Sequence, residues 1–219
     1  DLYTHELSAA SDVYKRQVAL DLFMFYVFWE LTLIPMFFLI LKWGGKDRKY
    51  ASQKFFIYTF TASVVMLLGL ITLYFLQDPY SLPSAGTMTG RSFSIPELID
   101  SARQSNIGDQ WYLGEQMQKL LFVMLMIGFL VKLPAVPFHT WLPDAHVQAP
   151  TGGSMLLAGV MLKMGAYGMF RLPISLFPHA LYHFQLALMI IGMVSLVWGA
   201  IVCLGQTTVS YTHLRAHET

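Results

Sequence analysis

Residues 131–168 read VKLPAVPFHTWLPDAHVQAPTGGSMLLAGVMLKMGAYG, and they combine apolar stretches with two lysines, Lys132 and Lys163. A transmembrane helix needs about 20 mainly apolar residues, because a helix rises 1.5 Å per residue through about 30 Å of hydrocarbon. The mainly apolar segment that contains Lys163, residues 153–171, is close to that length. Directly after Lys132 come Pro134 and Pro137, which remove helical hydrogen-bond donors and free carbonyl groups. The stretch therefore predicts membrane-spanning helices, one of them broken between Lys132 and Pro137.

The composition of the whole chain supports a membrane protein. Of its 219 residues, 55% are hydrophobic and 12% are charged, whereas soluble domains carry about 25% charged residues. The mean hydropathy is +0.52. The net charge of +1 gives no basic patch that would favour nucleic acid as a partner. The lone Cys203 excludes an internal disulfide, and no Cys or His spacing is typical of a metal site. We therefore expect neither a metal nor a redox cofactor in this chain.

Five segments approach the length of a membrane span and together predict an all-α polytopic membrane protein. Helices are the only option for segments of this length, because a lipid-exposed backbone must satisfy its own hydrogen bonds. The loop 42–54 carries an excess of Lys and Arg, which places it in the cytoplasm. The acidic connection 77–116 is expected to be external, with a short surface helix near Pro96. The predicted spans are 19–41, 53–76, 117–138, 153–171 and 182–204.

The two ends of the chain are interpreted as added segments that do not belong to the natural protein. Within residues 1–17, the segment Ser8–Gln17 resembles an in-frame translation of a sequencing adaptor, and residues 209–219 resemble the matching adaptor of the other end. Ordinary polar termini are the alternative. Such segments are excluded from fold reasoning, because basic residues ahead of an apolar run imitate a signal peptide. Residues 18–208 are then expected to be a fragment of a longer membrane domain.

Three ionisable residues lie within the predicted spans: Glu30, Lys132 and Lys163. Each costs at least about 2.5–3.5 kcal/mol at the bilayer centre. A dry lysine without a counter-charge tends to lose its proton, and an opposite charge nearby retains it, which is what a proton relay requires. Glu30 lies roughly 16 Å into its span, too deep for a short carboxylate to reach the interface. A static ion pair for Glu30, a lysine that snorkels from a helix end for Lys132, and a purely structural role for all three remain alternatives.

A polar cluster follows the predicted break, with His139, Asp144 and His146. Histidine titrates near pH 6.5, which suits a proton shuttle. Capping or packing of the loop explains the cluster equally well, and better in the case of Asp144. A metal site is not expected, because one Asp and two His lack a fourth ligand.

Two separate stretches carry a specific resemblance. Residues 131–168 resemble the signature region of the antiporter-like membrane subunits of respiratory complex I, NADH:quinone oxidoreductase. Residues 25–45, FYVFWELTLIPMFFLILKWGG, and 48–59, RKYASQKFFIYT, resemble the preceding helix pair of the same proton-conducting family. Within the family, residues 143–168 and 171–178 are most similar to the M type, which corresponds to mitochondrial chain 4.

The resemblance implies a fourteen-helix antiporter-like fold with two inverted repeats, of which these spans form a part. It implies that Lys132 pairs with a glutamate such as Glu30, that Lys163 passes protons toward a central water-filled axis, and that His139 helps to connect this path. Multisubunit sodium/proton antiporters and membrane-bound hydrogenases share the Trp-Leu-Pro-Asp-Ala core, so membership of either complex is the alternative.

For the whole protein, the resemblance implies a non-redox subunit of an H⁺-translocating NADH:quinone oxidoreductase in a bacterial plasma membrane. Electron transfer from NADH to quinone would then be coupled to proton pumping through the buried Glu and Lys residues. FMN, iron–sulfur clusters and quinone would be bound by other subunits. The implied partners are the other membrane-arm subunits, including neighbouring antiporter-like subunits, and the lipid bilayer.

Overall fold

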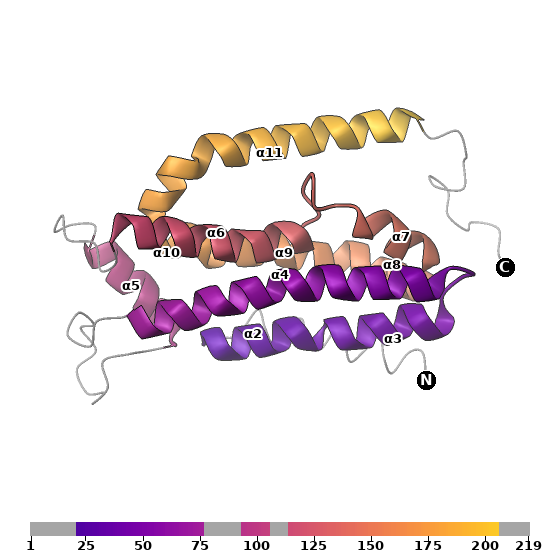
Figure 1. Ribbon diagram of the computed structural model, residues 1–219, viewed down its shortest axis with the longest axis horizontal. Coiled ribbons are helices and arrows are strands. Elements are labelled where there is room, and N and C mark those ends of the chain that lie inside the picture. Colours follow the sequence, from indigo (N-terminus) through magenta and orange to yellow (C-terminus); the bar gives the residue numbers. More distant parts are fainter. Residues whose placement is uncertain (1–20, 77–92, 106–113, 206–219) are drawn as a thin grey trace.

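The computed structural model describes residues 21–76, 93–105 and 114–205. Within these ranges the chain is helical apart from its connections and one isolated β-bridge between Asp21 and Ser94. The long helices run roughly along the long axis of the molecule (Figure 1). The predicted all-α class is therefore confirmed. The two terminal segments interpreted as additions, 1–17 and 209–219, lie outside the described residues.

The first span consists of two helices, α2 (Leu22–Leu31) and α3 (Leu33–Trp43), which are separated at Thr32. The carboxylate of Asp21 caps α2 by accepting hydrogen bonds from the backbone N–H groups of Phe23 and Met24, at 2.8 and 3.1 Å. The interruption lies just before Pro35, as expected, because the proline ring cannot pack beneath a regular preceding turn. The Thr32 hydroxyl donates a hydrogen bond to the Trp29 carbonyl at 2.8 Å, so the interruption is internally satisfied.

The second span, α4 (Arg48–Leu76), is followed in the described chain by the short helix α5 (Ile95–Ser105). The predicted short surface helix is therefore confirmed. It covers one end of the bundle with the buried side chains of Ile95, Leu98 and Ala102. In addition, the ring of Phe93 stacks on Tyr74 at 4.1 Å between centroids.

The remaining helices begin at α6 (Glu115–Lys132), which ends at the predicted break. A non-helical loop, 133–140, connects α6 to α7. The chain continues through α7 (Trp141–Gln148), α8 (Thr151–Leu156), the π-helical segment η1 (Leu157–Met161), α9 (Leu162–Arg171), α10 (Pro173–Leu176) and α11 (Pro178–Gly205).

Four helical segments in the described ranges are long and apolar enough to cross a membrane: Leu22–Trp43, Arg48–Leu76, Thr151–Leu176 and Pro178–Val202. They coincide with four of the five predicted spans. The predicted span 117–138 is divided into α6 and part of the loop that follows it. Helix α6 is not among these four segments. It is 18 residues long and carries three charged residues, Glu115, Lys119 and Lys132.

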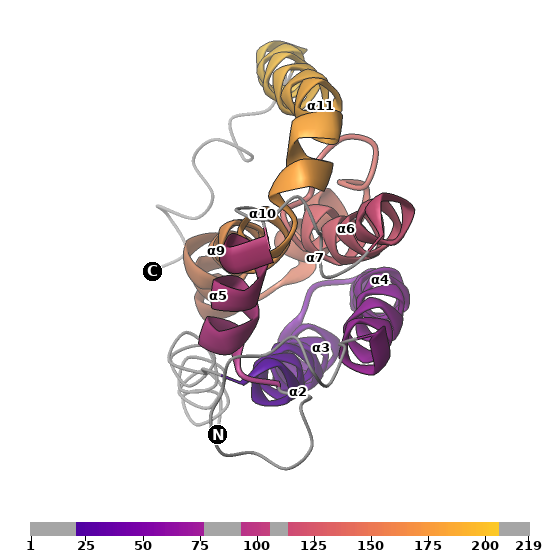
Figure 2. The same cartoon turned by 90° about the vertical axis from the view of Figure 1, so that its left-hand side faces the viewer.

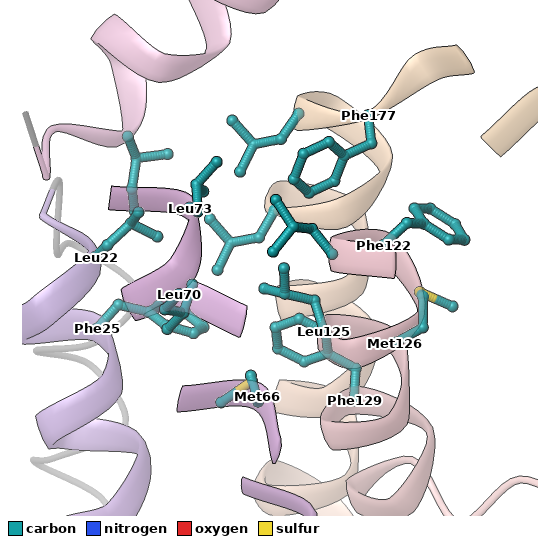
Figure 3. Packing of buried hydrophobic residues seen from close by; sticks show 14 of the residues in the cluster. Leu22, Phe25, Met66, Leu70, Leu73, Phe122, Leu125, Met126, Phe129 and Phe177 are labelled. Atoms are coloured by element: carbon teal, nitrogen blue, oxygen red, sulfur yellow. The ribbon is translucent and has the colours of Figure 1, made fainter. Parts of the chain in front are cut away.

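The main apolar core lies between α2, α4, α6 and the α9–α10 pair. Figure 3 shows Phe25, Met66, Leu125 and Phe129 pointing toward one another from three of these helices. Close packing depends on glycine at two helix contacts. A methyl group at Gly128 would lie 2.8 Å from Met66 Cβ, and one at Gly168 would overlap the Phe129 ring. Small residues at these two positions therefore let the helices approach closely.

Helix α11 packs differently from the other spans. In the most apolar 18-residue stretch of its span, Pro178–Val202, no residue is buried by the rest of the described chain, whereas Ala180 in its first turn belongs to the core. Figures 1 and 2 show α11 diverging from the bundle beyond its first turns. Near its middle, the Ser195 hydroxyl accepts a hydrogen bond from the Val136 N–H at 2.9 Å, which joins α11 to the loop after α6.

The contact of Gly168 on α9 with Phe129 on α6 predicts that a larger side chain at position 168 lowers the stability of the fold. Replacing Gly168→Leu forces the new side chain against Phe129, and overpacking of this kind costs about 1–3 kcal/mol. We expect a lower melting temperature of the full-length subunit in detergent. The matched control is Gly159→Leu, because nothing in the described chain lies within 4 Å of a methyl group at Gly159. Equal melting temperatures for the two variants would contradict this packing.

Candidate functional site

Lys132, the last residue of α6, lies inside the helix bundle. Its side chain is only 2% exposed. Its Nζ atom lies 5.2 Å from the centroid of the Trp29 ring, which belongs to α2. A lysine that snorkelled from the end of its helix would point toward the interface and would be exposed. The alternative of a snorkelling Lys132 is therefore wrong, because the ammonium points into the core.

The ring of Trp29 packs between two other aromatic side chains. Its ring is 1% exposed and stacks on Phe25, with 5.8 Å between centroids. The ring also meets Phe129 edge-on, at 5.2 Å and an interplanar angle of 90°. Phe129 lies on α6 three residues before Lys132, so one turn of α6 presents both a ring and an ammonium group to Trp29. This contact fixes the position of α2 relative to α6.

Glu30 follows Trp29 in the chain and lies near the end of α2. The residue is partly buried; one carboxylate oxygen, Oε1, is inaccessible and accepts no hydrogen bond from any described residue. Tyr26, one helical turn earlier, lies within electrostatic range of Glu30 and near Ser63 on α4. Glu30 is thus the chain neighbour of the tryptophan whose ring the Lys132 amine contacts.

A tryptophan satisfies one of the carbonyl groups that the break after Lys132 leaves free. The indole Nε1–H of Trp141 donates a hydrogen bond to the Val131 carbonyl at 2.9 Å. A second carbonyl, that of Leu130, loses its helical donor at Pro134 and accepts instead from the Ala135 N–H at 3.1 Å. Carbonyl groups at membrane depth need such partners. The residue types after Lys132 predict the break, but they do not reveal that Trp141 satisfies it.

Helix α7, which carries Trp141, is attached to α4 by a salt bridge. Lys54 Nζ donates to Asp144 Oδ2 at 2.6 Å, and both side chains are half-buried. Next to this pair, the Trp141 ring packs on Phe55 at 5.3 Å between centroids. Asp144 thus forms an ion pair between two helices, and the N-terminus of α7 has no side-chain cap. The sequence gives no sign of this role for Lys54, because it is one of several basic residues in the segment 42–54.

A second attachment holds the end of α7. The Gln148 carbonyl accepts a hydrogen bond from the Gly45 N–H at 3.0 Å, and its side-chain oxygen accepts from the Asp47 N–H at 3.2 Å. Gly44 is required beside this contact, because a methyl group there would lie 2.8 Å from the Gln148 carbonyl oxygen. The loop between α3 and α4 thus binds the segment that follows the break.

Lys163, in contrast, is not brought into contact with Lys132. It is the second residue of α9, directly after η1, and its side chain is exposed on the described chain. On another side of α9, a methyl group at Gly165 would lie 2.9 Å from the Leu133 backbone nitrogen. Helix α9 therefore packs against the break through Gly165 while presenting Lys163 outward. Single π-helical turns such as η1 occur frequently at functional sites.

His139 lies in the loop 133–140 beneath α11. Its ring is edge-on to Trp198 at 6.5 Å between centroids, and its Nδ1 atom is buried without a hydrogen bond from the described residues. The Nδ1 atom of His146, on α7, is also buried without a hydrogen bond from the described residues. His146 lines a cavity of about 280 Å³ together with Ser154 and Met155. The structure therefore separates the two histidines into different surroundings.

The sequence of the chain matches a family of membrane proteins, described as NADH:quinone oxidoreductase/Mrp antiporter, TM, over residues 19–211. The chain belongs to this family. It is 45% identical over 192 residues to the F(420)H(2) dehydrogenase subunit M of Methanosarcina mazei, covering 86% of this chain and 35% of that protein. It is also 45% identical over 189 residues to the NADH-quinone oxidoreductase subunit M of Rhodobacter capsulatus, with 86% and 35% coverage.

The fold has a solved counterpart in the respiratory complex I from Thermus thermophilus. One chain of that structure superposes with a TM-score of 0.71 at 28% identity, over 86% of this chain and 36% of the other. The predicted resemblance to the M-type antiporter-like subunits is therefore confirmed, and the chain is a multi-pass membrane protein. It spans about a third of the length of the relatives it matches.

The Trp141 hydrogen bond predicts a measurable contribution to stability. Replacing Trp141→Phe retains an aromatic ring next to Phe55 but removes the donor to the Val131 carbonyl. An unsatisfied buried carbonyl costs about 1–3 kcal/mol. We expect a lower melting temperature of the full-length subunit in detergent, compared with the control Trp43→Phe near a helix end. A Trp141→Phe variant as stable as the control would show that this bond contributes nothing.

Proposed function

We propose that this chain is part of a proton-translocating, non-redox membrane subunit of an H⁺-translocating NADH:quinone oxidoreductase. In this proposal Glu30, Lys132 and Lys163 carry protons and His139 helps to connect them. The observation that carries the proposal is the burial of the Lys132 ammonium at a helix break, against the ring of Trp29, the residue that precedes Glu30. A charge in this position costs several kcal/mol, which favours a functional role over a packing role.

The chemistry of the proposed relay follows from the two charge states of Lys132. The amine takes up a proton and is stabilised as the ammonium when Glu30 is ionised. When Glu30 becomes protonated or moves, that stabilisation falls and the proton leaves the amine for the next acceptor. Lys163 is the proposed next amine, since it lies on the helix that packs against the break through Gly165. The exposed face of α9 that carries Lys163 would adjoin other parts of the longer protein.

The proposed setting is a multisubunit complex in the bacterial plasma membrane. Other subunits would bind FMN, the iron–sulfur clusters and quinone, and other membrane-arm subunits, including antiporter-like ones, would be the neighbours. The equal identity to the subunit M of an F(420)H(2) dehydrogenase supports a second candidate, in which reduced F420 replaces NADH as the electron donor. A multisubunit sodium/proton antiporter and a membrane-bound hydrogenase remain further candidates. Purifying the complex and testing NADH and reduced F420 as donors separates the first two.

Glu30→Gln tests the relay. The substitution removes the ionisable group while the side-chain volume hardly changes. We therefore expect normal assembly and a loss of coupled proton transfer of about 100-fold or more, since a proton-transfer group typically contributes about 10²–10⁴-fold. The measurement is proton uptake in vesicles that contain the assembled complex. The control is Glu97→Gln on the external helix α5. Unaltered pumping by Glu30→Gln would count against the relay.

Lys163→Met tests whether the exposed lysine is a carrier or a structural residue. A carrier role predicts an assembled complex with strongly reduced pumping, because methionine fills similar space but binds no proton. The control is Lys42→Met, which removes an exposed lysine at the end of α3. Assembly would be checked by native gel electrophoresis. Retained pumping in the assembled Lys163→Met complex would support a purely structural role.

A further inference from the structure

The contact between Trp29 and Lys132 has a chemical consequence of its own. We infer that Trp29 is a further functional residue of the site, whose indole face stabilises the protonated form of Lys132 and thereby sets the pH range over which this amine retains its proton. The inference rests on the proposed function, because it assigns a role to Trp29 in the same proton transfer.

The geometry is that of a cation–π interaction. Such contacts form when a cation lies within about 6 Å of the centroid of an aromatic ring, and tryptophan is the strongest of the aromatic partners. The distance of 5.2 Å from Lys132 Nζ to the Trp29 centroid lies within this limit. Both side chains are almost completely buried, at 2% and 1% exposed. Removal from water strengthens the interaction, because bulk solvent no longer screens it.

The ring discriminates between the two protonation states of the amine. The negative face of the indole attracts the positive charge of the ammonium, whereas a neutral amine offers it no net charge. Trp29 therefore favours Lys132 with its proton bound. Phe25 and Phe129 contact the ring from two sides, and the indole itself carries no ionisable charge, so its preference does not depend on pH. Glu30 differs from Trp29 in that its own charge can change.

Other ionisable groups lie on the elements around the end of α6. They are Glu30 and Tyr26 on α2, Lys163 and Tyr167 on α9, and His139 in the loop 133–140. On the adjacent part of α4 the buried polar groups are the hydroxyls of Thr59 and Ser63, which do not ionise. Trp29 thus contributes to the stability of the protonated Lys132 amine in a way that does not change with pH, whereas the neighbouring ionisable groups titrate. Its removal should shift the pH dependence of transfer without changing the number of titrating groups.

The test is the pH profile of proton pumping by the assembled complex with Trp29→Leu. We expect the alkaline limb to move to lower pH by about one unit, because the amine releases its proton more easily without the ring. Trp29→Phe should give a smaller shift in the same direction. The control is Phe25→Leu, which disturbs the same aromatic cluster without removing the ring that faces the ammonium. This control should lower the rate at all pH values and leave the midpoint unchanged.

The outcomes separate the inference from the proposed function. A purely structural Trp29 would lower the rate with an unmoved midpoint, or would shift it no further than Phe25→Leu does, and either result would overturn the inference. Lys132→Met serves as the reference for the relay itself. If Lys132→Met pumps normally, the proposed function fails; if it does not pump and the Trp29→Leu midpoint is unmoved, only the role of Trp29 fails.

Discussion

A buried positive charge at the end of a broken helix determines how the rest of this chain is built. Lys132 needs partners inside the bundle, because neither lipid nor the apolar core solvates an ammonium group. The Trp29 ring lies against it, Glu30 lies next in the chain, and the Phe25, Trp29 and Phe129 rings pack these residues in place. The aromatic cluster thus positions the charge, and it also connects α2 to α6. Packing and function depend on the same side chains at this point.

The break itself is stable because its carbonyl groups find new donors. Trp141 supplies an indole N–H to Val131, and backbone bonds satisfy the neighbouring turn. This arrangement requires α7 to lie beside α4, where the Lys54–Asp144 pair and the Phe55 contact hold it. Residues that are far apart in the chain therefore cooperate to keep one short loop in shape at membrane depth. The glycines of α9 complete the site, since larger side chains would keep α9 away from Phe129 and Leu133.

Much of this could be predicted from the sequence, because membrane helices and proline breaks follow from local chemistry. Hydropathy indicated the spans, and Pro134 and Pro137 indicated where α6 ends. Glu30 and Lys132 stood out since charged residues are rare in apolar spans, and the structure places the Lys132 amine against the ring of Trp29, the residue before Glu30. The partners were not predictable: Trp141 donates to a carbonyl ten residues earlier, and Lys54 pairs with a residue 90 positions away. Such contacts depend on tertiary packing, which periodicity does not report. The outward direction of Lys163 was equally invisible, since helical phase alone does not say which face meets a neighbour.

The salt bridge between Lys54 and Asp144 joins α4 to α7 at an end of the bundle where both side chains are partly exposed. Helix α7 also carries the indole that donates to the Val131 carbonyl in the last turn of α6. The partly exposed ion pair is therefore connected, through the short helix α7, to the residue that precedes Lys132, and a change of charge on either partner would act at the surface on the helix that holds the break.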